Sequence, residues 1–421
     1  MRKIALVFPG QGSQYTGMGK AFYEQYAIAK ETFEEADEAL GFGLTSLCFE
    51  GPEEQLRRTE FTQPAILAHS VAAYRAYMQE VGIKPHFMAG HSLGEITALT
   101  CSGAIPFADA IRIVNKRGQF MQEAVTIGTG AMSAISNVSA IEVERVCRET
   151  STEQELVAVS NYNSPSQTVI AGHVAAVEAA EQKLKGLGAQ PIRLKVSAPF
   201  HCPLMNTAAF QLEQELLQRA FSDPKTSVIA NYNALPYAGA NRIVQALTLQ
   251  MTEPIQWHAT MQFLKNQGVN VLVELGPGAV LRNLMKKTFP SIYSYSYDKE
   301  EDRAGLNELL SSDKLEYPCF VSRCLAIAVC TRNHNWNEEE YQTGVIAPYR
   351  RIQSMLAEVE QNGQKPTLEQ KHDALRMLQS VFAAKKAPLD EQEERFAQLF
   401  EETNTRRELF DEVPVIQARQ S

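Results

Sequence analysis

The sequence has no run of about 18 consecutive apolar residues, the length that a helix needs to span a membrane. Its amino-terminal apolar run stops at Phe8, which is too short for a secretory signal peptide. That run is better interpreted as a buried strand of a parallel sheet. We therefore expect a cytoplasmic protein that does not cross a membrane.

The sequence also lacks an excess of positive charge. Its 40 Lys and Arg residues against 49 Asp and Glu residues give a formal net charge of −9, so no basic surface for nucleic acid is expected. Seven scattered cysteines argue against a disulfide framework, because they are odd in number. The group Cys319, Cys324, Cys330 and His334 matches no zinc-binding spacing, so we expect neither a metal nor another cofactor.

What remains is typical of a globular protein, with 44% hydrophobic and 21% charged residues in a chain of 421. Strand and helix patterns alternate at the start, which indicates a parallel sheet covered by helices. Residues 127–196 have a β-α-β-β-α-β order, typical of a ferredoxin-like module. The α/β features resume afterwards, so we predict an α/β-hydrolase-like core made of residues 1–126 and 197–297, with the ferredoxin-like subdomain inserted in it.

The remaining residues, 298–421, are richer in charge and helical by period. Thr367 and Gln370 have the spacing of a capping box at a helix start. We predict a mostly helical C-terminal extension. The run from Phe320 to Val329 is apolar enough to need burial.

The segment AGHSLGE places Ser92 between Gly90 and Gly94, where a short apolar run meets a helical pattern. The spacing G-x-S-x-G is typical of a nucleophile elbow, a strained strand-to-helix turn that exposes the serine hydroxyl. The start of the following helix offers unpaired N–H groups to a developing oxyanion. An ordinary βα loop would have similar residues, so the pattern alone leaves both interpretations open.

A serine nucleophile needs a base, and His201 is the best placed of the eight histidines. It lies in APFHCPLM, just beyond a predicted strand and between two prolines, hence on a rigid loop at a sheet end. His91 adjoins Ser92 and would point elsewhere, and His69 lies within an apolar helix. A loop histidine without a catalytic task is the alternative for His201.

The glycine-rich loop after the first predicted strand does not match a nucleotide-binding motif. Tyr15 stands where G-x-G-x-x-G requires its last glycine, and Met18 stands where a P-loop requires lysine. This loop could instead supply a backbone N–H to an oxyanion hole, and Gln11 is placed for that role.

Arg117 lies at the edge of an apolar stripe on the helix predicted for residues 107–125, beside Val114 and Met121. A guanidinium on an inward face is costly without an anionic partner. It could form a structural salt bridge or extend to solvent along its apolar stem. It could also bind a substrate carboxylate in a bidentate manner.

Together these pieces resemble the malonyl-CoA:acyl carrier protein transacylases, from residue 1 to about 297. The matching segments are FPGQGSQ at 8–14, TQPA at 62–65, AGHSLGE at 89–95, RGQFMQEAV at 117–125, GTGAM at 128–132, NSPSQTVIAG at 163–172, PFHCPLM at 199–205, PIQW at 254–257 and ELGPG at 274–278. The resemblance implies an acyltransferase whose partners are malonyl-CoA and an acyl carrier protein.

The resemblance also implies roles for individual residues. Ser92 is the nucleophile and His201 its base, oriented by a backbone carbonyl near Gln250 rather than by an aspartate. The backbone N–H groups of Gln11 and Leu93 form the oxyanion hole. The residues expected to bind the substrate are Arg117, which holds the malonyl carboxylate, and Gln63, Met121, Asn161, Phe200 and Gln250.

Two features bear on substrate and pathway. In related acyltransferases a Phe-His pair such as Phe200-His201 goes with malonyl rather than methylmalonyl transfer. The minimal enzyme of this family ends near residue 310, and extra segments are typical of acyltransferases that act in trans for modular polyketide synthases. We therefore expect supply of a polyketide or fatty acid synthase, and the extension favours the polyketide synthase. The alternative is an acyl hydrolase that clears stalled carrier proteins, which would not need Arg117.

Overall fold

The computed structural model describes residues 2–126, 128–194, 196, 198–311, 318–362, 364–403 and 405. The chain divides into two compact units, residues 3–310 and a second unit formed mainly by the residues after 310. We describe each unit by itself. None of the helices within the described ranges combines the length and apolarity required to cross a membrane.

A five-stranded parallel sheet forms the centre of the larger unit, in the order β7-β2-β1-β8-β9. Its strands are β1 (Ile4–Phe8), β2 (Phe87–Gly90), β7 (Ser227–Ile229), β8 (Val271–Glu274) and β9 (Tyr293–Ser296). The strand predicted before Phe8 is thus the central one. In parallel sheets of this kind, ligands bind beyond the carboxyl ends of the strands.

Helices cover both faces of this sheet, because successive residues of β1 point to opposite sides. Ile4, Leu6 and Phe8 belong to one apolar cluster, with side chains of α5 (Thr59–Glu80), α6 (Leu93–Cys101), α7 (Phe107–Glu123) and α10 (Asn206–Leu216). Ala5 and Val7 belong to a second cluster, with α12 (Trp257–Asn266) and α13 (Val280–Thr288). Further helices are α1 (Lys20–Gln25), α2 (Ala27–Leu40), α3 (Leu44–Glu50), α4 (Glu53–Leu56) and α11 (Ile243–Thr252).

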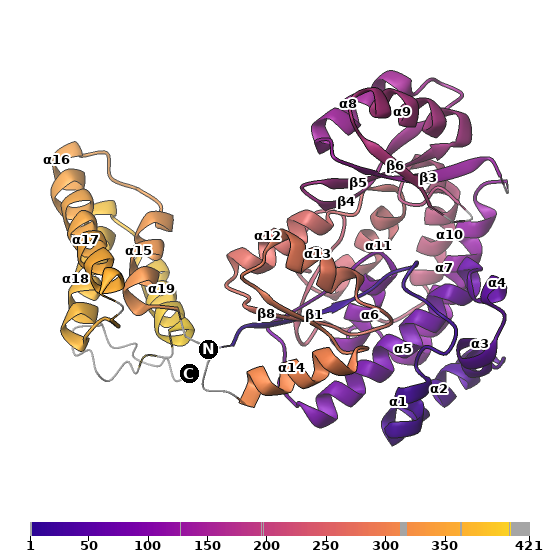
Figure 1. The fold of residues 1–421 in the computed structure, drawn as a ribbon, viewed down its shortest axis with the longest axis horizontal. Coiled ribbons are helices and arrows are strands. Elements are labelled where there is room, and N and C mark those ends of the chain that lie inside the picture. The colour runs from indigo at the N-terminus through magenta and orange to yellow at the C-terminus, as the bar shows by residue number, and fades with distance from the viewer. Residues whose placement is uncertain are drawn as a thin grey trace. The chain divides into compact units, whose positions relative to one another are not determined.

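A second, antiparallel sheet is inserted between α7 and α10, in the order β4-β5-β3-β6. It contains β3 (Gly130–Ser136), β4 (Val157–Ser164), β5 (Gln167–His173) and β6 (Gln190–Arg193), with α8 (Ala140–Thr150) and α9 (Val174–Gly186). The two helices pack on its outer face (Figure 1). The order β-α-β-β-α-β and this strand arrangement confirm the ferredoxin-like fold predicted from the sequence.

Helix α14 (Glu300–Ser311) falls in the segment predicted to belong to the extension, which was expected to begin at residue 298. In the structure this helix packs on the larger unit, since Leu306 is fully buried in its main apolar cluster. The two compact units therefore separate at residue 310, a dozen residues later than the sequence pattern indicates. The composition becomes charged near residue 298 because α14 starts two residues later, at Glu300, with three acidic residues in its first turn, and not because the domain ends there.

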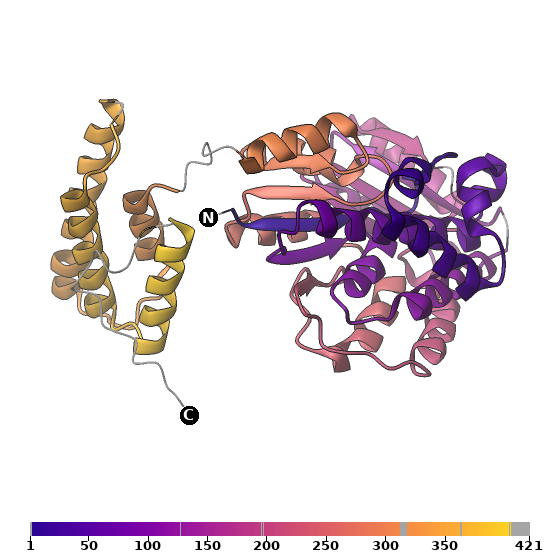
Figure 2. The same ribbon diagram turned by 90° about the horizontal axis from the view of Figure 1, so that it is seen from below.

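The extension is helical, as predicted, and has its own apolar core. Its helices are α15 (Phe320–Cys330), α16 (Glu338–Tyr341), α17 (Ala347–Gln361), α18 (Leu368–Lys385) and α19 (Leu389–Glu402), with a π-helical stretch at Gln342–Ile346. Several of them run alongside one another (Figure 2). The capping box is confirmed, because the Thr367 side chain accepts from the Gln370 N–H and the Gln370 side chain accepts from the Thr367 N–H.

A chain ending at Ser311 should fold on its own. The apolar clusters of residues 3–310 and of the extension have no residue in common, so each unit buries its own core. We expect the shortened protein to unfold thermally within about 3 °C of the matching transition in the full chain, which corresponds to about 2 kcal/mol for a unit of this size. Calorimetry of both proteins measures this. A shortened protein that aggregates, or melts far below that transition, would contradict it.

Candidate active site

Ser92 lies between the end of β2 and the start of α6, in a backbone conformation that few residues adopt (φ 53°, ψ −106°). The two flanking glycines permit it. A Cβ on Gly90 would lie 1.9 Å from backbone atoms of Gly94, and a Cβ on Gly94 would lie 2.0 Å from the Phe8 carbonyl oxygen. The turn therefore has the geometry of a nucleophile elbow, with its serine beyond the carboxyl end of the sheet.

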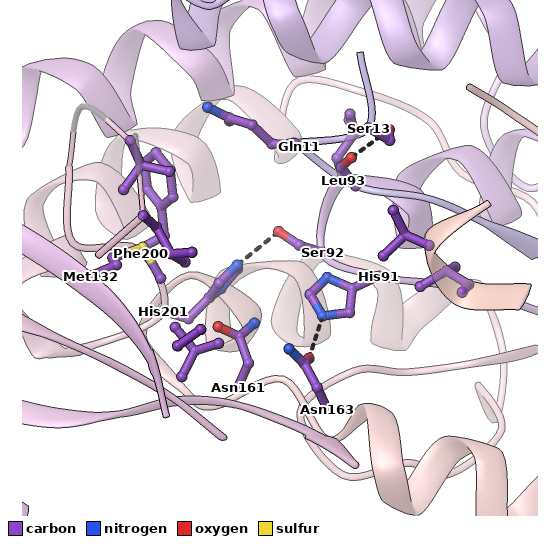
Figure 3. Close-up of a pocket in the computed structure, with 18 of the residues that line it drawn as sticks. Gln11, Ser13, His91, Ser92, Leu93, Met132, Asn161, Asn163, Phe200 and His201 are labelled. Atoms are coloured by element: carbon purple, nitrogen blue, oxygen red, sulfur yellow. Dashed lines mark hydrogen bonds between the residues drawn. The ribbon is translucent and has the colours of Figure 1, made fainter. Parts of the chain in front are cut away.

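His201 faces Ser92 from the loop before α10. The Ser92 Oγ lies 2.7 Å from the His201 Nε2 (Figure 3). The His201 Nδ1 lies 2.6 Å from the backbone carbonyl oxygen of Gln250, which can only accept, so Nδ1 carries the hydrogen and Nε2 is free to accept one. Burial, reinforced by the positive charge of Arg117, lowers the pKa of His201 to about 3. The ring is therefore neutral and suited to act as a base.

Arg117 reaches the same point from α7 and is buried, with 1% of its surface exposed. Its guanidinium donates to Gln63 Oε1 and to Gln250 Oε1, each at 2.8 Å, and to Ser92 Oγ at 3.1 Å. Among the described residues it forms no direct ion pair with a carboxylate, and its Nε has no hydrogen-bond partner. Burial lowers the pKa of Arg117 to about 10, so the group stays charged at neutral pH. A buried cation in this state favours an incoming anion.

A cavity of about 540 Å³ opens in front of these three residues. Most of the residues predicted for the site line it, namely Gln11, Gln63, Leu93, Met121, Asn161 and Phe200, in addition to Ser92, Arg117 and His201. Gln250, predicted to bind substrate, is not among the lining residues. It lies behind Arg117 and His201 and contacts both of them.

Gln11 and Leu93 bring backbone N–H groups to the same end of the sheet. Gln11 lies in the turn after β1, and Leu93 is the first residue of α6, where an N–H has no carbonyl of its own helix to bind. Both residues lie on the same side of Ser92 in Figure 3. This arrangement suits the negative charge that develops on a carbonyl oxygen attacked by Ser92.

Three polar residues close to the Ser92 turn were not predicted from the sequence. They are Asn231, Glu95 and Tyr237. Asn231 accepts from the Ser92 N–H and donates to the Gly90 carbonyl oxygen, both at 2.7 Å. The buried carboxylate of Glu95 accepts from the side chains of Tyr237 and Gln250, at 2.5 and 2.7 Å. Glu95 alone gave a signal, an acidic residue in the first turn of a predicted helix, but that position is also ordinary helix chemistry.

His91 contributes to the cavity wall rather than to the Ser92 pair. Its Nε2 lies 3.0 Å from Asn163 Oδ1, and burial lowers its pKa. Of the basic residues in α13, Lys287 lines the cavity and Lys286 is exposed, whereas Arg282 pairs with Asp302 at 2.8 Å.

Comparison with known proteins agrees with this geometry. The family model described as "Acyl transferase domain" matches residues 5–314. The chain is 37% identical over 397 residues to a malonyl CoA-acyl carrier protein transacylase from Bacillus subtilis, covering 93% of this chain and 99% of that protein. It is 44% identical over 310 residues to the Escherichia coli K12 protein of the same name, covering 73% of this chain and 100% of that protein.

Solved structures give the same result. A malonyl CoA-acyl carrier protein transacylase from Coxiella burnetii is 40% identical with a TM-score of 0.72, over 74% of this chain and 98% of that one. A malonyl-transacylase in complex with a type II PKS acyl-carrier protein is 41% identical with a TM-score of 0.71, over 73% of this chain and 99% of that one.

His201 should stay neutral from pH 8 down to pH 5, because burial and the Arg117 charge lower its pKa to about 3. Nitrogen NMR of the imidazole, assigned with a His201→Gln variant, measures this. In Arg117→Ala the pKa should rise. The unfolded chain protonates this histidine below about pH 6.5 and the native chain does not, so the fold loses stability as the pH falls from about 6.5 toward 3. A His201 titration midpoint near 6.5 would contradict the neutral base.

Proposed function

The chain belongs to the malonyl-CoA:acyl carrier protein transacylases of the acyl transferase family, and from that premise we propose that it moves malonyl groups through an ester on Ser92. The donor is malonyl-CoA and the acceptor is the phosphopantetheine thiol of an acyl carrier protein. The observation that carries the proposal is the buried guanidinium of Arg117, 3.1 Å from the Ser92 hydroxyl oxygen. A carboxylate-bearing acyl group on Ser92 would reach that cation.

In the first half-reaction, Ser92 attacks the thioester carbonyl. Its proton passes to the His201 Nε2, which lies 2.7 Å away. The N–H groups of Gln11 and Leu93 bind the carbonyl oxygen while it carries negative charge. The C–S bond then breaks, and the proton on His201 goes to the departing sulfur, so free CoA leaves and Ser92 holds a malonyl ester.

The second half-reaction runs the same groups in the other direction. The carrier protein's thiol gives its proton to His201, and its sulfur attacks the ester carbonyl. The C–O bond to Ser92 breaks, and the proton returns to the Ser92 oxygen. The Gln250 carbonyl holds the imidazole in place in both steps, since it accepts from the Nδ1–H throughout.

Substrate choice follows from charge and shape. Arg117 binds the free carboxylate of the malonyl group, with Gln63 fixing the guanidinium from one side. Phe200, 6% exposed and lining the cavity, would crowd a methyl branch on the acyl chain. Met121 and Asn161 complete the proposed binding pocket. A hydrolase of carrier-bound acyl groups would have no use for the Arg117 cation, so that alternative is disfavoured.

We also propose that the malonyl groups supply a polyketide synthase rather than a fatty acid synthase. Support comes from the extension. The E. coli relative aligns over its full length with 73% of this chain, so that relative has no counterpart of the extension. The B. subtilis relative aligns with 93% of this chain, so that similarity continues into the extension. A related transacylase was solved with a type II PKS carrier protein. A cytoplasmic location stays a prediction.

Mixing the protein with malonyl-CoA should add one malonyl group, and Ser92→Ala should abolish the adduct while the fold persists. The reason is that no other hydroxyl has the elbow geometry with a histidine 2.7 Å away among the residues described. Intact-mass spectrometry measures the adduct, and circular dichroism checks the fold. Adding carrier protein should remove the adduct by transfer. An adduct that persists on Ser92→Ala would identify another nucleophile, and loss to water without carrier protein would identify a hydrolase.

Arg117→Ala should lose malonyl loading selectively. Removal of a charged, buried hydrogen-bonding partner costs about 1.5–3 kcal/mol, which lowers kcat/KM for malonyl-CoA by about 10- to 150-fold. Acetyl-CoA lacks the carboxylate, so its loading should change little or improve. Parallel kinetics with the two thioesters measure the ratio. Equal losses for both substrates would show that Arg117 is structural.

A further inference from the structure

Glu95 is a fully buried carboxylate that lines no part of the cavity and has no part in the steps above. It lies in the first turn of α6, three residues after Ser92. Its oxygens accept from three donors of other elements: the Tyr237 hydroxyl at 2.5 Å, the Gln250 Nε2 at 2.7 Å and the Asn231 N–H at 3.1 Å. Three donors on one carboxylate are characteristic of a group that holds its neighbours in place.

The contact with Gln250 determines which way that amide points. The Gln250 Nε2 donates to Glu95 and to the Ser92 carbonyl oxygen, and its Oε1 accepts from Arg117. A reversed amide would turn its NH₂ group toward a guanidinium, which only donates, and its oxygen toward a carboxylate, which only accepts. Glu95 and Arg117 therefore impose the same orientation from opposite ends.

The hydrogen bonds that link Glu95 to Arg117 through the Gln250 amide form a bridge. This bridge brings an acidic group near Arg117 without direct contact between the two. Glu95 is separated from the guanidinium by the length of one amide. Burial raises the pKa of Glu95 to about 7, against the opposing effect of its three donors and of the Arg117 charge, and in its ionised form it favours the charged form of Arg117. Because the bridge approaches from behind the cavity, the guanidinium still faces the Ser92 hydroxyl. A carboxylate in direct contact with Arg117 would instead compete with the malonyl group.

We infer that Glu95 is a positioning residue for malonyl loading: it fixes the Gln250 amide, and through it the guanidinium that receives the substrate carboxylate. The inference rests on the proposed function. Glu95 also accepts from the Asn231 backbone N–H, and the Asn231 side chain accepts from the Ser92 N–H. Glu95 therefore stabilises the turn at Ser92 as well as the Gln250 amide.

The test compares Glu95→Ala with Glu95→Gln. In Glu95→Ala the Gln250 amide loses its fixed acceptor, so malonyl loading should fall by about tenfold or more, as for loss of one charged hydrogen bond, with a smaller fall for acetyl. In Glu95→Gln the new amide oxygen can accept from Gln250 and its NH₂ can donate to the Tyr237 oxygen, so the ratio of malonyl to acetyl loading should return to near wild type. Intact-mass time courses on Ser92 give both rates.

Glu274→Ala is the matched control. Glu274 is also a fully buried carboxylate at the end of a strand, but its oxygens accept from the N–H groups of Leu281 and Arg282 at the start of α13. It should lower the melting temperature and leave the malonyl-to-acetyl ratio unchanged. If Glu95→Ala is insoluble, Gln250→Leu removes the same bridge without leaving a cavity and should lower the ratio in the same way.

The outcomes separate the two claims. Suppose that the wild-type protein loads malonyl and that Glu95→Ala or Gln250→Leu keeps the wild-type ratio of malonyl to acetyl loading. This result overturns the positioning role alone. A Glu95→Gln variant as unselective as Glu95→Ala overturns it too, because charge rather than amide orientation would then be responsible. A wild-type protein that takes up no malonyl overturns the proposed function and this inference with it.

Discussion

The site is organised around a buried positive charge, the Arg117 guanidinium, which no carboxylate among the described residues contacts directly. A guanidinium removed from water is costly unless acceptors and an opposite charge are near it. Gln63 and Gln250 accept from the terminal nitrogens of Arg117 through amide oxygens, its Nε has no partner among the described residues, and the Glu95 carboxyl lies one amide away. Burial, reinforced by the same cation, lowers the pKa of His201, which keeps the base neutral. The nucleophile Ser92, the base His201 and the carboxylate-binding Arg117 therefore depend on one arrangement of polar groups.

The fold contributes by bringing distant segments to one end of the parallel sheet. Ser92 follows β2, the Gln11 turn follows β1, and Asn231 follows β7, each beyond the carboxyl end of its strand. The inserted antiparallel sheet adds the opposite wall of the cavity, through side chains such as Met132 and Asn161. The site thus lies between two sheets that the chain forms separately, and neither sheet contains all of it.

Much of this was predictable from the sequence, and the limits have physical reasons. The G-x-S-x-G spacing predicted the turn at Ser92 because the close approach of Gly90 to Gly94 is local, although the clash that excludes a Cβ at Gly94 is with Phe8, far away in the sequence. Helical periodicity, which is also local, placed Arg117 at the edge of an apolar stripe but left open whether its guanidinium is buried or reaches solvent. The partners of Glu95 could not be predicted, because Tyr237 and Gln250 are more than 140 residues away in the chain. The extension was predicted to begin at 298, before α14, because composition changes there while packing continues to Leu306.

The hydrogen-bond acceptor that orients His201 is part of the main chain, and this has a consequence for how the protein can vary. Where an aspartate side chain fills that role, a single substitution can delete it. Here every residue that could replace Gln250 brings the same carbonyl oxygen, so no single substitution at position 250 can remove the acceptor. A substitution at position 250 therefore keeps the acceptor that orients His201, while the side chain at that position can change during selection for a different acyl group.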